Sequence, residues 1–174
     1  MAMVAESGWE SLTMASLGAR AGVSRQSVYN EVGTKADLAE ALVAQELATF
    51  LAAVAEELAG AADLGSGVRA ATLRVYSMAE DNPLLREIVS TAHGAGQGLL
   101  PLLTTQAQPL IGAAAAAVAH GIESDFPLPV HARARLGEAS DTVVRLVLSN
   151  IMQPGGSPEE MADSAAWVAV RLLG

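Results

Sequence analysis

The residues that could take part in recognition chemistry lie in one short segment near the start of the chain. From Arg20 to Lys35 there are three basic residues against Glu31 alone, and Lys35 is the single lysine of the sequence. Lysine and arginine neutralise phosphate groups, so this local excess could contact nucleic acid. The whole chain has a net charge of −9, which argues against a general nucleic-acid binder. Any such contact must therefore come from this segment.

Apolar and small residues in the same region have the spacing of a helix-turn-helix. Leu17 and Val28 would pack two short helices together. Gly22 would allow the chain to turn after Ala21, and Val23 would fill the corner. A helical hairpin in another kind of all-α protein would show the same spacing. The motif alone therefore leaves both interpretations open.

A wider stretch resembles the DNA-binding domain of the TetR family of transcriptional regulators. The matching segments are Gly8 to Thr13, Leu17 to Ser24, Val28 with Tyr29, and Gly33 to Leu38. The later helices match the family in number and length. Two features depart from its pattern: Val32 stands where an aromatic residue is more common, and the first helix of most members begins earlier. We therefore expect a short or truncated first helix here.

The resemblance implies that the second helix of the motif reads DNA. Arg25, Gln26 and Ser27 would begin this helix, where side chains reach base edges in the major groove. Arginine can bind guanine, and glutamine can bind adenine, through paired hydrogen bonds. Thr13, at the start of the preceding helix, would offer its hydroxyl and nearby backbone N–H groups to a phosphate.

Further residues of the motif receive roles from the same resemblance. Tyr29 matches a tyrosine that gives its hydroxyl to a phosphate, and Lys35 matches a phosphate-contacting lysine at the start of the next helix. Ser24 is expected to cap the recognition helix with or without DNA. Plainer alternatives exist, because Tyr29 could be a core aromatic and Arg25 and Lys35 could be solvated charges. The predicted DNA contacts are Thr13, Ser24, Arg25, Gln26, Ser27, Tyr29 and Lys35.

The composition favours a helical protein with an aliphatic core. Hydrophobic residues make up 51% of the chain and aromatic residues 3%, and alanine and leucine lose little side-chain freedom in a helix. No convincing strand alternation is present. A break is predicted between residues 60 and 67, and a loop at 124–129. Helices are predicted at residues 1–7, 14–21, 25–30, 35–58, 68–80, from 83, at 99–119, at 130–152 and from 158.

Several classes of function are not expected from this sequence. The chain has no cysteine, which removes disulfides, thiolate metal sites and cysteine nucleophiles. His93, His120 and His131 are isolated, so we expect neither a metal site nor a cofactor. No nucleophile is paired with a base, so we do not expect an enzyme. The longest uncharged apolar run, Leu110 to Ala119, is too short to span a membrane. With no signal-peptide pattern at the start, we expect a soluble, cytoplasmic protein.

The resemblance further implies a helix-turn-helix DNA-binding domain at residues 1–46 and an effector-binding and dimerisation domain at residues 47–174. In the family, the last two long helices pair with their copies in a second chain. Apolar residues from Val143 to Ile151 cover more than one face, as in a helix packed on its own core and on a partner. A thick monomeric core would show the same pattern. Small residues of the last helix allow close approach: Ala162, Ala165, Ala166 and Ala169.

Two segments, Asn82 to Val89 and Gly98 to Pro109, look similar to actinobacterial TetR regulators associated with alkane oxidation and lipid metabolism. Residues Arg145 to Ser149 agree with that group. This resemblance implies a long-chain fatty acid or a related alkyl compound as effector, and an aliphatic lining suits such a chain. Each candidate anchor could instead be a surface, loop or satisfied core residue. The candidates are Arg86, His93, Gln97, Thr105 and Trp167.

These observations together predict an all-α, TetR-type transcriptional repressor. A homodimer would place two recognition helices in successive major grooves, about 34 Å apart, on a near-palindromic double-stranded operator. The hydrophobic effector would favour a conformer with another separation, transmitted through residues 35–58. One alternative is a helical lipid-binding protein of the same fold that has lost DNA binding, as the acidic charge and short first helix would suggest. A small helical hydrolase is the other alternative.

Overall fold

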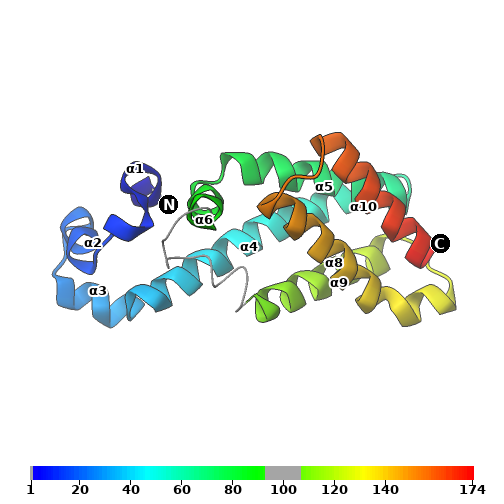
Figure 1. Ribbon diagram of the computed structural model, residues 1–174. Coiled ribbons are helices and arrows are strands. Elements are labelled where there is room, and N and C mark those ends of the chain that lie inside the picture. Colours follow the sequence, from blue (N-terminus) through cyan, green and yellow to red (C-terminus); the bar gives the residue numbers. More distant parts are fainter. Residues whose placement is uncertain (1, 93–106) are drawn as a thin grey trace. The chain divides into compact units, whose positions relative to one another are not determined.

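The computed structural model describes residues 2–92 and 107–174, and every regular element in these ranges is an α-helix (Figure 1). The predicted all-α fold is thereby confirmed. The described helices divide into two compact units. Unit 1 consists of Met1–Glu46 with Asp81–Ala107, and unit 2 of Leu47–Glu80 with Gln108–Gly174. The helices are α1 (Ala2–Ser11), α2 (Met14–Ala21), α3 (Arg25–Val32), α4 (Lys35–Ala59), α5 (Leu64–Asp81), α6 (Pro83–Ala92), α8 (Gln108–Asp125), α9 (Val130–Met152) and α10 (Pro158–Leu173).

Unit 1 contains the three short N-terminal helices and α6. Helix α2 packs against α3, and α1 packs against α6. Gly8 interrupts α1 with a φ of 75° and a ψ of 161°, a backbone conformation that residues with a Cβ rarely adopt. The helix end predicted at Gly8 is therefore a break, after which the chain forms one more helical turn. That turn brings Trp9 into the core of unit 1. The functional boundary expected between residues 46 and 47 stays a prediction.

In unit 1, the start of α6 is tied to α4 by Asn82. The side-chain oxygen of Asn82 accepts hydrogen bonds from the backbone N–H groups of Leu84 and Leu85, at 2.9 and 3.1 Å. Its amide nitrogen donates to the Glu46 carboxylate at 2.6 Å. The helix start predicted at Asn82-Pro83 is confirmed, and its cap is also a contact to a second helix.

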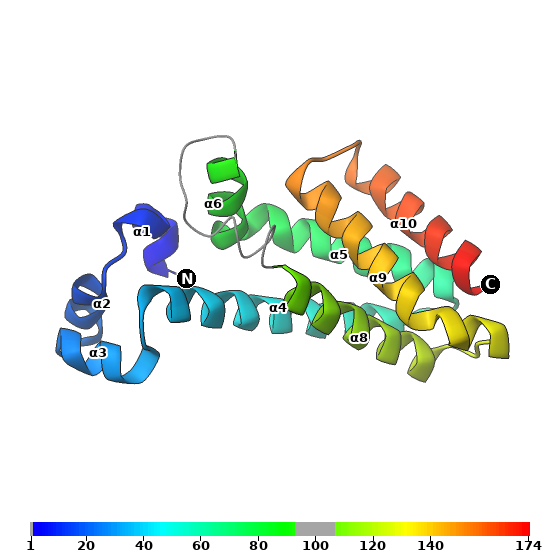
Figure 2. The same ribbon diagram turned by 60° about the horizontal axis from the view of Figure 1, so that its bottom comes forward.

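Unit 2 has an aliphatic core between its helices. Helix α9 lies between α8 and α10 and packs against both (Figure 2). In the main buried cluster of the described residues, Phe126 is the one aromatic side chain among alanine, valine, leucine and isoleucine, and Tyr76 is buried elsewhere in the unit. Its buried members are Leu58, Val68, Ile122, Phe126, Ala132, Leu136, Ala139, Val143, Ala165, Ala169 and Leu173.

Two predicted boundaries in unit 2 were wrong. Helix α5 begins at Leu64, although residues 64–67 were assigned to a break because of their glycines. The reason is the cap at Asp63, whose Oδ1 accepts the Ser66 N–H at 2.8 Å, and helix initiation by such a cap outweighs the low helix propensity of glycine. Helix α8 extends to Asp125, so the loop predicted from Ser124 starts later. Residues 99–106, the first part of the helix predicted at 99–119, lie outside the described residues.

One described helix, α4, is long and apolar enough to cross a membrane by length and composition alone. This helix was not among the uncharged apolar runs considered in the sequence, because it contains Glu40 and Glu46. Long alanine- and leucine-rich helices of water-soluble proteins have the same composition, so this similarity is weak support for a membrane span.

Candidate nucleic-acid interface

The caps of α2 define where the helix-turn-helix begins and turns. The Thr13 side chain accepts a hydrogen bond from the Ser16 backbone N–H at 3.0 Å, and the Ser16 hydroxyl oxygen accepts one from the Thr13 N–H at 3.0 Å. This capping box leaves Thr13 exposed at the helix N-terminus. At the other end Gly22 adopts the left-handed conformation, with φ 71° and ψ 24°. The predicted cap and turn are both confirmed.

Gly18 lies where α2 comes close to the backbone that leads into α3, a role that its position in the sequence did not indicate. A Cβ added at Gly18 would lie 2.8 Å from the Val23 carbonyl oxygen and 3.3 Å from the Arg25 nitrogen. Since both neighbours are backbone atoms, a larger residue would push the two helices apart. Val23 was expected to fill the corner, but it is 48% exposed. The corner is closed by the backbone of Gly18 instead, which also accepts the Val23 N–H at 2.9 Å.

Helix α3 presents one buried anchor and a row of exposed polar residues. Val28 is 8% exposed and holds the helix against the unit 1 core. Ser24 caps the helix by accepting the Ser27 N–H at 3.1 Å. The side chains of Arg25, Gln26 and Ser27 are exposed on the first turn, so the residues expected to reach base edges are available to a ligand.

The exposed side chains of α3 pair along the helix at a spacing of four residues. The Arg25 guanidinium lies 5.3 Å from the centre of the Tyr29 ring, within the range of a cation–π contact. Tyr29 is itself exposed, so the alternative of a core aromatic is wrong. The Gln26 amide donates to the Asn30 side-chain oxygen at 2.9 Å. Asn30, which the sequence pattern did not indicate, therefore shares the exposed face with Gln26.

Lys35 occupies the first position of α4, behind a second capping box. Asp37 accepts the Thr34 N–H at 2.7 Å and the Thr34 hydroxyl at 2.8 Å, and the Asp37 N–H donates to the Thr34 hydroxyl oxygen at 3.2 Å. The backbone and side-chain hydrogen bonds from Thr34 lower the pKa of Asp37 below its ordinary value. The Lys35 ammonium donates to the Glu10 carbonyl oxygen at 3.1 Å and lies 5.1 Å from the centre of the Trp9 ring.

The three basic residues of the motif differ in their partners. Arg20 forms a two-pronged ion pair with Glu6, with one nitrogen–oxygen distance of 2.9 Å. The hydrogen bond from Arg20 lowers the pKa of Glu6 below its ordinary value. Arg25 and Lys35 contact only uncharged groups in the contacts described above. Their positive charges are therefore not neutralised by those contacts, and they are the stronger candidates for phosphate.

Two family models match this chain. The model of bacterial regulatory proteins of the tetR family matches residues 1–42. The model of the C-terminal domain of the bacterial tetracycline repressor matches residues 63–171, more than half of the chain. The chain belongs to the TetR family. It is accordingly a DNA-binding transcriptional regulator with an N-terminal helix-turn-helix.

Individual proteins agree with this assignment. A relative from Mycobacterium tuberculosis, the HTH-type transcriptional regulator AlkX, is 28% identical over 162 residues, which cover 92% of this chain and 74% of the relative. The crystal structure of the TetR family repressor AlkX from Dietzia sp., implicated in biodegradation of n-alkanes, superposes with a TM-score of 0.76 at 24% identity. That match covers 98% of this chain and 89% of the Dietzia protein. A TetR-like regulator from Rhodococcus sp. RHA1 has a TM-score of 0.56 at 16% identity, covering 97% and 87%.

The residues expected to anchor an effector lie in three separate places along this TetR-family chain. Arg86 is exposed on α6 in unit 1. Trp167 is 62% exposed on α10 in unit 2, with the Arg171 guanidinium 5.6 Å from its ring centre. His93, Gln97 and Thr105 lie outside the described residues. Their common role in binding an effector stays a prediction.

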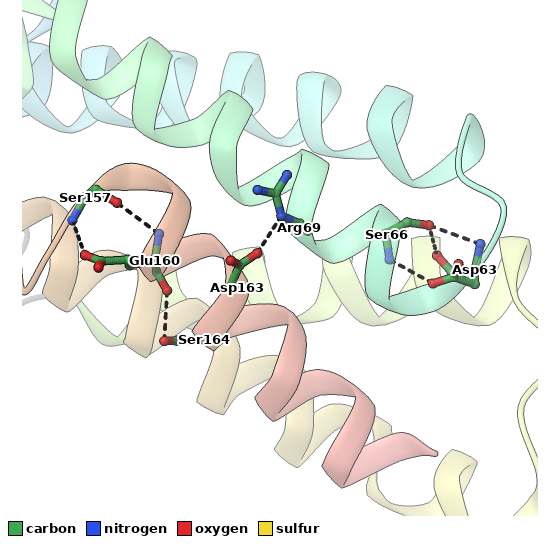
Figure 3. A network of polar contacts seen from close by, with 7 residues as sticks. All are labelled: Asp63, Ser66, Arg69, Ser157, Glu160, Asp163 and Ser164. Carbon is green, nitrogen blue, oxygen red and sulfur yellow. Dashed lines mark hydrogen bonds and ion pairs between the residues drawn. The ribbon is translucent and has the colours of Figure 1, made fainter.

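Figure 3 shows polar contacts at α5 and α10 of the regulator's unit 2, one of which joins the two helices. Arg69 on α5 forms an ion pair with Asp163 on α10. Ser157 caps α10 by accepting the Glu160 N–H at 3.2 Å, while Glu160 accepts the Ser157 N–H at 2.9 Å. The capping box predicted at Ser157 is confirmed, and the Arg69–Asp163 ion pair is an exposed contact between α5 and α10.

Two features of unit 2 were not apparent from the sequence. Ser140, on the inner face of α9, is 1% exposed, and its hydroxyl has no hydrogen-bond partner among the described residues. On the outer face of α10, Trp167 and Val170 are exposed large apolar side chains.

Among the described residues no cluster of three potential metal ligands occurs.

Proposed function

We propose that this TetR-family regulator is a homodimeric repressor that binds a near-palindromic operator through α3 of each protomer. The observation that carries the proposal is the first turn of α3. Arg25, Gln26 and Ser27 are exposed there, on a helix that Val28 anchors from behind. Side chains in this position can form the paired hydrogen bonds that distinguish bases in the major groove. Thr13, Ser24, Tyr29 and Lys35 would bind the phosphates that flank those bases.

The dimer would form through the outer faces of α9 and α10. Trp167 is 62% exposed and Val170 is 42% exposed in the single chain. Tryptophan is enriched among the residues that contribute most to protein–protein interfaces. The opposite, buried face of the same helix, made by Met161, Ala162, Ala165, Ala169 and Leu173, is already used within the chain, where α10 packs against α9. A second copy would cover the exposed side chains of α10 and bring two α3 helices onto one duplex.

The effector would be a long-chain fatty acid or a related alkyl compound. The core of unit 2 is almost entirely aliphatic, and burial of each methylene group contributes about 0.8 kcal/mol. The Dietzia AlkX repressor, a structural neighbour, is implicated in biodegradation of n-alkanes, which supports an alkyl ligand for this chain as well. The effector would have to bind the conformer that releases DNA more tightly than the conformer that binds it. This function needs no cofactor and no catalysis, and it places the protein in the cytoplasm with the chromosome.

Operator selection followed by effector titration tests this proposal. A duplex is selected from a randomised library with the wild-type protein, and its affinity is measured by gel shift. Saturated fatty acids of increasing length should then release the duplex, with effector affinity rising about fourfold per added methylene until the site is filled. A flat aromatic dye serves as the control and should not release it.

Different failures of this experiment lead to different conclusions. If no duplex is selected while the fatty acids bind the protein, the chain is the lipid-binding protein that has lost DNA binding. If a duplex is selected but no alkyl compound releases it, the repressor is retained and the alkyl effector is rejected. A selected site without two-fold symmetry would contradict the dimeric arrangement.

A further inference from the structure

The contacts of Lys35 with the end of α1 have no role in the function proposed so far. Lys35 lies at the N-terminus of a 25-residue helix, where the helix dipole disfavours a positive charge. The Trp9 ring and the Glu10 carbonyl oxygen offset this, because both present negative charge density to the ammonium group. The cation is thus held at the start of α4 by groups from another helix.

Trp9 is a rigid support for this contact. Its side chain is 4% exposed, so packing holds the ring in place. The positive φ of Gly8 starts the short turn that carries Trp9 and Glu10, and the Leu12 N–H closes this turn on the Trp9 carbonyl oxygen at 3.2 Å. Ring and carbonyl therefore approach Lys35 from one stable segment.

The arrangement leaves part of the ammonium group available. An ammonium has three N–H donors, and one of them is used by the Glu10 carbonyl. Lys35 is half-buried, so its remaining donors are accessible from the open side. A lysine side chain loses much conformational freedom when it is immobilised. Here that loss would occur during folding and not during DNA binding.

We propose that Trp9 is a positioning residue for DNA binding, which holds the Lys35 ammonium in place so that it meets a phosphate without further ordering. This inference rests on the proposed repressor function and adds to it a residue that does not itself touch DNA. If the contact only ties α1 to α4, loss of the ring would change stability, but its effect on DNA affinity would not depend on Lys35.

Nuclear magnetic resonance of the free protein tests the first half of the proposal. Because the sequence contains one lysine, carbon-13 lysine labelling gives a single side-chain Cε signal. Its protons should be shifted upfield by the Trp9 ring current, and the shift should disappear in Trp9→Leu. The exposed Trp167, replaced in the same way, is the matched control and should leave the signal unchanged. An unshifted lysine signal in the folded wild-type protein would overturn the inference.

A double-mutant cycle on the selected duplex tests the second half. Trp9→Leu should weaken DNA binding about threefold per protomer, which is about tenfold for a dimer, with the salt dependence retained because the lysine can still reach the phosphate. Lys35→Gln should reduce the slope of log affinity against log salt by about one per protomer. In the Lys35→Gln background, Trp9→Leu should have no further effect. Arg25→Gln is the control, because the Arg25 cation lies over the Tyr29 ring and not over Trp9. Its effect on DNA affinity should add to the effect of Trp9→Leu.

The outcomes separate this inference from the proposed function. An equal loss from Trp9→Leu with and without Lys35 would overturn the inference, as would an unchanged salt slope in Lys35→Gln, and both leave the repressor intact. Failure of the wild-type protein to bind any selected duplex would refute the proposed function and the inference with it. If circular dichroism shows that Trp9→Leu does not fold, Trp9→Phe carries the same cycle, with a smaller ring-current shift and a smaller loss of affinity.

Discussion

The helix-turn-helix and the α9–α10 pair use their side chains in opposite ways. In α2 and α3, exposed polar residues are proposed to read DNA, and local caps and a close backbone contact at Gly18 set their positions. In the α9–α10 pair only α10 begins with a capping box, since the Pro129 cap of α9 makes no side-chain hydrogen bond. The surface proposed to assemble is an apolar face carrying Trp167. On the proposed function, the recognition helix would act through exposed polar side chains, and the assembly face through an exposed apolar anchor, Trp167. The following predictions test that difference.

The largest effect is expected at the apolar face. Trp167→Glu places a charge on the proposed dimer interface and should raise the dimer dissociation constant by more than thirtyfold, equivalent to about 2 kcal/mol or more. Light scattering coupled to gel filtration measures it. Val23→Glu is the matched control for dimer formation, because Val23 is 48% exposed between α2 and α3, outside the proposed dimer interface. A dimer that tolerates Trp167→Glu would move the assembly surface away from α10.

The next effect contrasts two helical glycines, one in each region. Gly18→Ala should destabilise the protein by roughly 1–3 kcal/mol and weaken DNA binding, because its Cβ would meet backbone atoms of Val23 and Arg25. Gly137→Ala, in α9, has nothing within 4 Å of its added Cβ and should stabilise by about 0.5–1 kcal/mol. Chemical denaturation measures both. Equal effects at the two positions would contradict the close approach at Gly18.

A smaller gain is expected from the unit 2 core. Ser140→Ala removes a buried hydroxyl that lacks a partner among the described residues and should raise the free energy of unfolding by about 1 kcal/mol. Urea titration gives the change, and Ser164→Ala serves as the control, since the exposed Ser164 hydroxyl donates to the Glu160 carbonyl at 2.9 Å. A loss of stability in Ser140→Ala would mean that the hydroxyl is in use.

The smallest effect is expected in the pH dependence of stability, to which each unit contributes through a capping aspartate of its own. Hydrogen bonds from Thr34 lower the pKa of Asp37 in unit 1, and those from Ser66 lower the pKa of Asp63 in unit 2. A carboxylate whose pKa is lowered in the folded protein stabilises the folded state at pH values above its ordinary pKa. This contribution disappears as the pH falls below about 4. Asp37→Asn and Asp63→Asn should therefore each flatten the loss of stability in acid.

Tryptophan fluorescence assigns the acid response to a unit. Trp9 lies in unit 1 and Trp167 in unit 2, and they are the two tryptophans of the sequence. In Trp167→Phe the emission of Trp9 should follow the change caused by Asp37→Asn. In Trp9→Phe the emission of Trp167 should follow Asp63→Asn. An acid midpoint that neither substitution moves would contradict the role of these caps.

The sequence predicted the helix-turn-helix almost residue by residue because its signals are local. Thr13, Ser24 and Thr34 cap the helices that follow them, and a cap needs only neighbours within three positions. Gly18 and Trp9 escaped prediction because their roles depend on contacts between helices. Similarly, a break was predicted around Gly65 from composition, whereas the Asp63 cap initiates α5 there.

In unit 2 the sequence predicted where helices lie, but it did not predict which side chains face the core and which face outward. The bounds of α9 and the start of α10 follow from proline, serine and glycine positions. That Ser140 faces inward without a partner, and that Trp167 faces outward, depends on how three helices pack. Hydrophobic periodicity gives the buried stripe of a helix, but it does not tell which further face meets a second molecule.

Discrimination between DNA sequences by Arg25→Ala tests the central claim most directly. Affinities of the wild-type protein and the variant are compared on the selected operator and on a random duplex of equal length, at one salt concentration. Arg25→Ala should lose about tenfold to a hundredfold on the operator for each recognised guanine, and far less on the random duplex. An unchanged ratio of the two affinities would show that the exposed turn of α3 does not read the operator.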